Sequence, residues 1–129
     1  MQTRKERSAI KPSLVTVVDD DESVRESLPD LLREFGFAVH AFSSAEEFLA
    51  SDNVGETSCL ILDIAMPGMT GLDLQRELKI RGHQIPIIFM TAQKDEAVRA
   101  RAFEQGAAEF LLKPFSDTAL FAALNKALK

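Results

Sequence analysis

The sequence predicts an α/β fold in which helices cover both faces of a five-stranded parallel sheet. Strand-like and helix-like patterns alternate along the chain without a break in composition, which is typical of successive β-α-β units. The strand-like segments are short continuous apolar runs, the pattern of strands that are buried on both faces. The length of 129 residues fits one domain.

Four of the five strands are expected from such runs, and the second is expected as a short strand. Residues 14–18 form the first strand, and Phe37 to Phe42 form the second. The other three runs each stop at a residue that can take part in chemistry. They are 59–62 before Asp63, 86–90 before Thr91, and 110–112 before Lys113.

The first helix is expected after Asp21, where an apolar stripe begins at helical spacing. Gly36 ends this helix. Pro29 lies inside it and removes a backbone hydrogen bond, so we expect a kink there. The residues of the stripe are Val24, Leu28, Leu31, Leu32 and Phe35.

Four further helices complete the alternation. Residues 44–47 have the spacing of a capping box and open a short helix through Leu49. The remaining helices are expected at 72–81, 95–105 and 117–128. We expect the last helix to bury Leu120, Leu124 and Leu128.

The strand ends supply residues that can bind a ligand or react. The carboxyl ends of parallel strands share one edge of the sheet, and ligands of open α/β sheets bind at that edge. The sequence therefore predicts one site that combines these residues. They are Asp19 and Asp20 after the first strand, Asp63 after the third, Thr91 after the fourth and Lys113 after the fifth.

The three carboxylates of this site indicate a metal ion. Side by side, they would repel one another and raise one another's pKa values. Mg²⁺ removes that cost, because it prefers oxygen ligands and binds through one or two carboxylates together with phosphate oxygens. The alternative is that residues 19–21 cap the next helix. Asp21 is the expected cap, since Asp19 and Asp20 lie closer to the strand end.

Asp63 is the expected nucleophile of the site. A carboxylate can attack phosphorus and form an acyl phosphate, and phosphoryl transfer requires that the charge on the phosphoryl oxygens is neutralised. Mg²⁺ would neutralise one oxygen, the Lys113 ammonium a second, and the Thr91 hydroxyl with backbone N–H groups the third. The alternative for Lys113 is an ordinary surface lysine, which its place between an apolar run and Pro114 disfavours.

The bulk properties exclude several classes of function. A formal net charge of −5 disfavours direct binding to nucleic acid. No apolar stretch approaches the roughly 20 residues of a membrane span. Residues 1–13 have no hydrophobic segment, so we expect a flexible tail and no secretory signal. The single cysteine, Cys59, lies in an apolar run, which indicates a buried thiol and a cytoplasmic location.

Four segments resemble the receiver domains of two-component response regulators. They are VDD at 18–20, ILDIAMPGMTG at 61–71, MTA at 90–92 and FLLKPF at 110–115. Together with VRESL at 24–28, the last segment is most similar to nitrogen-fixation-type receivers that precede a helix-turn-helix DNA-binding domain. The resemblance implies a receiver domain at 14–129 with a flavodoxin-like doubly wound (βα)5 sandwich and strand order 2-1-3-4-5.

The resemblance also implies a role for each residue of the site. Asp63 corresponds to the phosphoacceptor. Asp20 corresponds to a direct Mg²⁺ ligand, Asp19 to a ligand through water, and the backbone carbonyl of Ala65 to a further ligand, with Asp63 completing the set. Lys113 would hold the phosphoryl group.

Two further pairs of residues match family positions with regulatory roles. On activation Thr91 would move toward the phosphoryl group and the ring of Phe110 would pack inward, without the hydroxyl of the commoner tyrosine. Ala65 and Gln93 occupy positions that tune the lifetime of the acyl phosphate. The resemblance also implies a cis bond between Lys113 and Pro114.

The function expected from the resemblance is that of a signalling phosphoacceptor, which is not an enzyme for outside substrates and catalyses only its own phosphoryl transfer and dephosphorylation. A sensor histidine kinase would supply the phosphoryl group. The face made by the fourth helix, fifth strand and fifth helix would then change. It would act on a partner, on a second copy of the chain, or on a C-terminal DNA-binding domain outside this chain that controls transcription.

Three other functions compete with this one. A phosphohydrolase with an aspartyl-phosphate intermediate usually has a second acid two residues after the nucleophile, where this chain has Ala65. A flavin- or nucleotide-binding domain requires a phosphate loop after the first strand, where residues 19–21 would repel phosphate. A degenerate receiver used only for docking is disfavoured by the complete set of site residues.

Overall fold

Five parallel strands form one sheet in the order β2-β1-β3-β4-β5, which confirms the predicted fold class and strand order. The computed structural model describes residues 12–129. The predicted N-terminal tail lies almost wholly outside these residues and stays a prediction. The strands are β1 (Leu14–Val18), β2 (Ala38–Phe42), β3 (Thr57–Asp63), β4 (Ile87–Thr91) and β5 (Glu109–Leu112).

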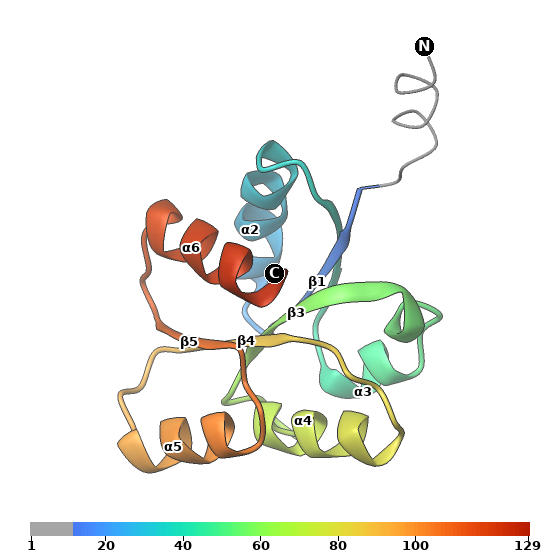
Figure 1. Cartoon of the computed structure of the whole chain (residues 1–129), viewed down its shortest axis with the longest axis vertical. Helices are drawn as coiled ribbons and strands as arrows, with labels where there is room; N and C mark the ends of the chain where they lie inside the picture. The colour runs from blue at the N-terminus through green and yellow to red at the C-terminus, as the bar shows by residue number, and fades with distance from the viewer. Residues whose placement is uncertain (1–11) are drawn as a thin grey trace.

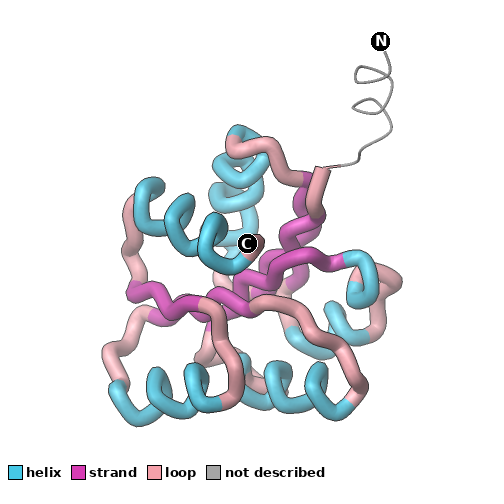
Figure 2. Tube along the Cα trace, in the orientation of Figure 1, coloured by secondary structure: helices cyan, strands magenta, loops and turns pink. Residues whose placement is uncertain are grey.

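The helices lie in two layers, one on each face of the sheet (Figures 1 and 2). One layer contains α2 (Glu22–Glu34) and α6 (Asp117–Ala127). The other contains α3 (Ala45–Leu49), α4 (Gly71–Ile80) and α5 (Glu96–Glu104). A short 3-10 helix, η1 (Val54–Glu56), precedes β3 and was not expected from the sequence. The five α-helices match the predicted ones to within a residue or two at each end.

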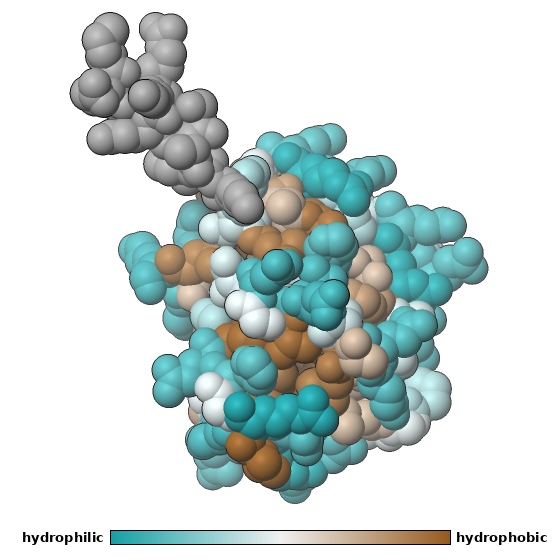
Figure 3. All heavy atoms as spheres, turned by 90° about the vertical axis from the view of Figure 1, so that its right-hand side faces the viewer, coloured by the Kyte–Doolittle hydropathy of each residue, from teal (hydrophilic) through white to brown (hydrophobic). Residues whose placement is uncertain are grey.

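The core is divided by the sheet into two clusters, as the alternation of side chains along a strand requires. In β3, Cys59 and Ile61 pack on the side of α2 and α6, whereas Leu60 and Leu62 pack on the opposite side. All four side chains are completely buried. The surface in Figure 3 is mostly hydrophilic, with hydrophobic residues visible between the polar side chains.

The last strand and the last helix differ from expectation in burial. β5 is an edge strand, so it is only partly covered, and Leu112 is 44% exposed. In α6, Leu120 and Leu124 are buried as expected, but Leu128 is 36% exposed. Leu128 is the C-cap residue and lies beyond the last full turn, which removes it from the apolar stripe. The predictions that these two leucines are buried were wrong.

Two local predictions concern the proline inside α2 and the capping of α3. α2 continues through Pro29, which is buried, and the kink expected there stays a prediction. Ser44 caps α3 by accepting a hydrogen bond from the Glu47 N–H, but the Glu47 carboxylate turns to the N–H and hydroxyl of Ser43. The predicted capping box is therefore only half formed, whereas a complete one occurs unpredicted at Thr70 and Asp73.

Candidate functional site

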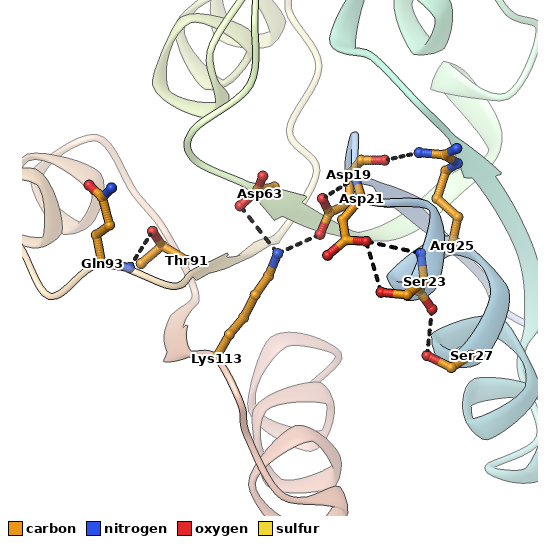
Figure 4. A network of polar contacts seen from close by, with 9 residues as sticks. All are labelled: Asp19, Asp21, Ser23, Arg25, Ser27, Asp63, Thr91, Gln93 and Lys113. Atoms are coloured by element: carbon orange, nitrogen blue, oxygen red, sulfur yellow. Dashed lines mark hydrogen bonds and ion pairs between the residues drawn. The ribbon is translucent and has the colours of Figure 1, made fainter.

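The site residues predicted from the strand ends meet at the carboxyl edge of the sheet. Asp63 and Thr91 are the last residues of β3 and β4, and Asp19 and Lys113 directly follow β1 and β5. The Lys113 side chain extends between the two acids (Figure 4), and its Nζ lies 2.7 Å from Asp19 Oδ2 and 3.6 Å from Asp63 Oδ1. One cation thus contacts two carboxylates from different strands.

Asp19, Asp20 and Asp63 form an acid cluster with the composition of a divalent metal site. One carboxylate oxygen from each lies within 4.8 Å of the others. Asp19 and Asp63 are buried, and Asp20 is exposed at the mouth of the cluster. A hard cation such as Mg²⁺ prefers an all-oxygen donor set of this kind and retains waters on its open side. The residues therefore fit the ion that the sequence predicts.

The electrostatics of the cluster show why a cation would be favoured there. The pKa of Asp63 is raised to about 6, first because the carboxyl group is buried and then because Asp19 and Asp20 are negative. The nearby Lys113 ammonium opposes this increase. Burial by itself would lower the pKa of Lys113, but its hydrogen bond to Asp19 and the charge of Asp63 raise it, so the ammonium keeps its proton.

The segment after β1 holds Asp19 in place through its own backbone. Asp21 caps α2, as expected, by accepting hydrogen bonds from the N–H and hydroxyl of Ser23. The Asp21 N–H donates to Asp19 Oδ1 at 2.9 Å. From within α2, Arg25 donates to the Asp19 backbone carbonyl at 2.9 Å (Figure 4). No role was predicted for Arg25 from the sequence, where its position six residues after Asp19 is the only signal of this contact.

Gly71 is a second residue of the site that the sequence analysis missed. It opens α4, and a Cβ atom there would lie 2.4 Å from the backbone oxygen of Asp63. The Gly71 N–H also donates to the Ile64 carbonyl at 2.9 Å. A residue without a side chain is therefore required for α4 to begin directly against the end of β3.

The structure describes every residue with a predicted switching or lifetime-tuning role. Thr91 is buried, and its hydroxyl oxygen accepts a hydrogen bond from the Gln93 N–H at 3.2 Å. The Phe110 ring is partly buried and packs against Phe89, with 6.3 Å between ring centroids. Gln93 and Ala65 are exposed. The Lys113–Pro114 bond is cis, as the resemblance implied.

Two surface grooves adjoin Lys113 and Phe110. The larger, about 740 Å³, lies between α2 and the start of α6, and its lining includes Leu28, Leu31, Lys113 and Phe115. The smaller, about 350 Å³, lies over β5, and its lining includes Arg99, Phe110, Leu112 and Phe115. Lys113 therefore faces the acid cluster and also borders a mainly apolar groove.

The remaining predictions concern single residues and the membrane. Cys59 is buried, and burial raises the pKa of its thiol to about 12, so it is a structural residue. None of the helices within residues 12–129 combines the length and the apolar character needed to cross a membrane.

Comparison with known proteins gives one consistent family. The family described as the response regulator receiver domain matches residues 15–125. The response regulator protein TodT of Pseudomonas putida is 43% identical over 128 residues, which cover 99% of this chain and 56% of the relative. The transcriptional regulatory protein FixJ of Azorhizobium caulinodans is 43% identical over 114 residues, which cover 88% of this chain and 54% of FixJ. The chain thus spans about half the length of these curated relatives.

Solved structures agree with the sequence comparison. The response regulator StyR has 46% sequence identity and a TM-score of 0.84, with 92% of this chain and 60% of that chain covered. The crystal structure of FixJ-N has 37% identity and a TM-score of 0.82, with coverage of 92% and 95%.

Proposed function

This chain belongs to the response regulator receiver domain family, and on that premise we propose that Asp63 accepts a phosphoryl group from a sensor histidine kinase. The observation that supports this proposal best is the position of Lys113 between Asp19 and Asp63. An ammonium at that point can pair with the Asp63 carboxylate before the reaction and with a phosphoryl oxygen after it. The fold, the acid cluster and the family thus support the same chemistry.

The proposed reaction requires little covalent chemistry from the protein. An oxygen of the Asp63 carboxylate attacks phosphorus and an O–P bond forms. The N–P bond of the phosphohistidine breaks, and the donor ring, which carries a proton on its other nitrogen, leaves as neutral imidazole. Asp63 must be ionised to attack, and a pKa of about 6 leaves it mainly ionised at neutral pH. Lys113 would turn from Asp19 toward the transferred group and pair with one of its oxygens.

Asp19, Asp20 and Asp63, together with the backbone carbonyl of Ala65, would hold Mg²⁺. The bound ion would supply positive charge that offsets repulsion between the acids and the incoming phosphoryl group. The chain's own part is to present Asp20 at the exposed mouth and to keep Asp19 fixed through the Asp21 N–H and the Lys113 ammonium.

The proposed output is a change of the face formed by α5, β5 and α6. Thr91 would connect the phosphorylated site to this face. Its hydroxyl would give up the hydrogen bond from the Gln93 N–H and bond to a phosphoryl oxygen. The space it vacates would admit the Phe110 ring, which borders the groove over β5. Only a few kcal/mol between the two arrangements are needed for such a switch. Ala65 and Gln93 would set how long the acyl phosphate lasts.

The proposed partners follow from the two grooves and from the relatives. The larger groove leads to Lys113 and suits an approaching donor domain of the kinase. The face of α5, β5 and α6 suits a second copy of the chain. Because the relative FixJ is a transcriptional regulatory protein of about twice this length, we include a DNA-binding output domain in the proposal. A cytoplasmic location completes it.

Phosphorylation by a small donor tests the proposal directly. The protein is incubated with acetyl phosphate and Mg²⁺, and its intact mass is measured for the wild type and for Asp63→Asn. We expect the wild type alone to gain one phosphoryl group. A wild type that gains none and shows no spectroscopic response to beryllofluoride would refute the proposal. Continuous release of phosphate from small phosphoesters would instead support a hydrolase.

A further inference from the structure

Glu46 on α3 contacts the loop that leads from the phosphoacceptor to α4. This loop comprises residues 64–70 and contains Ala65. Glu46 Oε2 accepts a hydrogen bond from the Met69 backbone N–H at 3.0 Å. The two residues are 23 positions apart in the sequence, so the bond connects two separate elements.

Gly68 packs against the same carboxylate. Its φ angle is +74°, and a Cβ atom there would lie 2.7 Å from Glu46 Oε2. Glycine is therefore favoured twice at this position, by the backbone conformation and by the close approach of the carboxylate. The tip of the loop and the Glu46 carboxylate fit each other closely.

The loop is fixed at two other points as well. At its base, the Gly71 N–H donates to the Ile64 carbonyl at 2.9 Å. In its middle, Met66 is buried in the core beside α3 and α4. Ala65 lies between these two points and only four residues before Met69, so its carbonyl belongs to the same short loop that Glu46 holds at the tip.

We propose that Glu46 is a positioning residue for the metal site, because its carboxylate fixes the tip of the loop and thereby the orientation of the Ala65 carbonyl. The inference rests on the proposed function, in which that carbonyl is a Mg²⁺ ligand. Glu46 acts through the Met69 N–H and has no contact with the acid cluster in this proposal.

The neighbouring Glu47 provides a matched control. It lies on the same helix and carries the same charge, but its Oε1 accepts hydrogen bonds from the N–H and hydroxyl of Ser43, at 3.1 Å and 2.9 Å. Glu46→Ala and Glu47→Ala therefore remove the same group and the same charge from neighbouring positions of α3. Only the first removes the contact with loop 64–70.

The test compares wild type, Glu46→Ala, Glu46→Gln and Glu47→Ala by Mg²⁺ titration and by hydrogen exchange of the Met69 amide without metal. We expect Glu46→Ala to weaken Mg²⁺ binding about tenfold more than Glu47→Ala does, a magnitude typical of residues that orient metal ligands. Exchange of the Met69 amide should accelerate in Glu46→Ala alone. Glu46→Gln keeps an acceptor oxygen and should recover most of the affinity.

Two outcomes would overturn the inference while the proposed function stands. In the first, the wild type binds Mg²⁺, but Glu46→Ala and Glu47→Ala bind it with equal affinity. The other is unchanged exchange of the Met69 amide in Glu46→Ala. Should Glu46→Ala unfold, Glu46→Asp keeps the charge but shortens the side chain by one methylene away from the Met69 N–H, and it must show the same weaker Mg²⁺ binding. A wild type without Mg²⁺ binding or phosphorylation would refute the proposed function itself.

Discussion

Lys113 makes its shorter ion pair with Asp19, at 2.7 Å, and its longer one with Asp63, the proposed phosphoacceptor, at 3.6 Å. The Asp19 side chain is completely buried, and that of Lys113 is 20% exposed. Without metal, the lysine therefore serves first as the counter-ion of a buried carboxylate. Its stabilising role and its proposed catalytic role are separable by experiment.

Lys113→Gln should lower stability and strengthen Mg²⁺ binding at the same time. The loss of the cation leaves Asp19 buried without its charge partner, which should cost about 3 kcal/mol in the free energy of unfolding. The same loss makes the cluster more negative, so its affinity for Mg²⁺ should increase while phosphorylation by acetyl phosphate slows. Urea unfolding, Mg²⁺ titration and intact mass measure the three effects.

Lys126→Gln is the control for this experiment, because Lys126 forms an exposed pair with Glu109 at 3.6 Å, away from the cluster. It should change stability by less than about 0.5 kcal/mol. A parallel decrease of Mg²⁺ affinity and stability in Lys113→Gln would contradict the counter-ion role.

Asp63→Asn should stabilise the metal-free protein at neutral pH. The pKa of Asp63 is raised from 3.8 to about 6 in the folded state, so the folded protein binds this proton more tightly than the unfolded chain. The free energy of unfolding therefore falls as pH rises between these two values and stays low above them. Asparagine does not titrate, so Asp63→Asn avoids this decrease. We expect its free energy of unfolding at pH 7 to exceed that of the wild type by roughly 1–3 kcal/mol.

Thermal unfolding between pH 3.5 and 8 in the presence of a chelator measures this effect. The difference between Asp63→Asn and wild type should shrink toward the acid end. Saturating Mg²⁺ should reduce this difference in stability at neutral pH, since the ion binds more tightly to the wild type, which has all three carboxylates. A wild type that is the more stable protein at pH 7 without metal would contradict the prediction.

Gly71→Ala should be strongly destabilising. The new Cβ would lie 2.4 Å from the Asp63 backbone oxygen, and backbone atoms at the end of β3 cannot move aside without disturbing the site. We expect a loss of about 2–4 kcal/mol in the free energy of unfolding, together with weaker Mg²⁺ binding. Gly55→Ala is the control, because a Cβ there would meet no atom within 4 Å. Equal stabilities of the two variants would show that α4 can withdraw from the strand end.

Gln75→Leu should change stability little, although it removes a buried hydrogen bond. Gln75 Nε2 donates to the Ala102 carbonyl at 3.1 Å, while its buried Oε1 has no partner among the described residues. The Ala102 carbonyl also accepts from the Ala107 N–H, so it stays paired in the variant. The lost bond and the removed unpaired oxygen should cancel to within about 1 kcal/mol.

Urea unfolding beside Leu78→Ala on the same helix checks this prediction. Leu78 is 2% exposed, and its truncation should cost about 2–4 kcal/mol. A comparable loss in Gln75→Leu would mean that this bond holds α5 to α4.

The predicted elements agree with the structure wherever a short apolar run ends at a polar residue. β1, β3 and β4 are central strands, and burial on both faces makes their runs continuous. β5 shows the limit of this pattern: its run looks the same, but the strand lies at an edge and leaves Leu112 exposed. Whether a strand is central depends on its partners, which local sequence does not specify.

Pairings between distant side chains were the least predictable part of the site. The sequence indicated that Asp19, Asp63 and Lys113 would meet, because parallel strands share an edge. It could not indicate that Lys113 would pair more closely with Asp19. Arg25, Glu46 and Gly71 were not assigned to the site for the same reason: their contacts depend on how α2, α3 and α4 dock.

The sequence by itself determined the order of elements, the strand ends that meet, and the acids and lysine placed there, because hydrophobic periodicity and strand polarity are local properties. Only the tertiary structure decided which carboxylates are buried, which one the ammonium pairs with most closely and which side chain contacts loop 64–70. Burial and pairing are set by distances between elements far apart in the chain, and the acid cluster owes its raised Asp63 pKa to those distances.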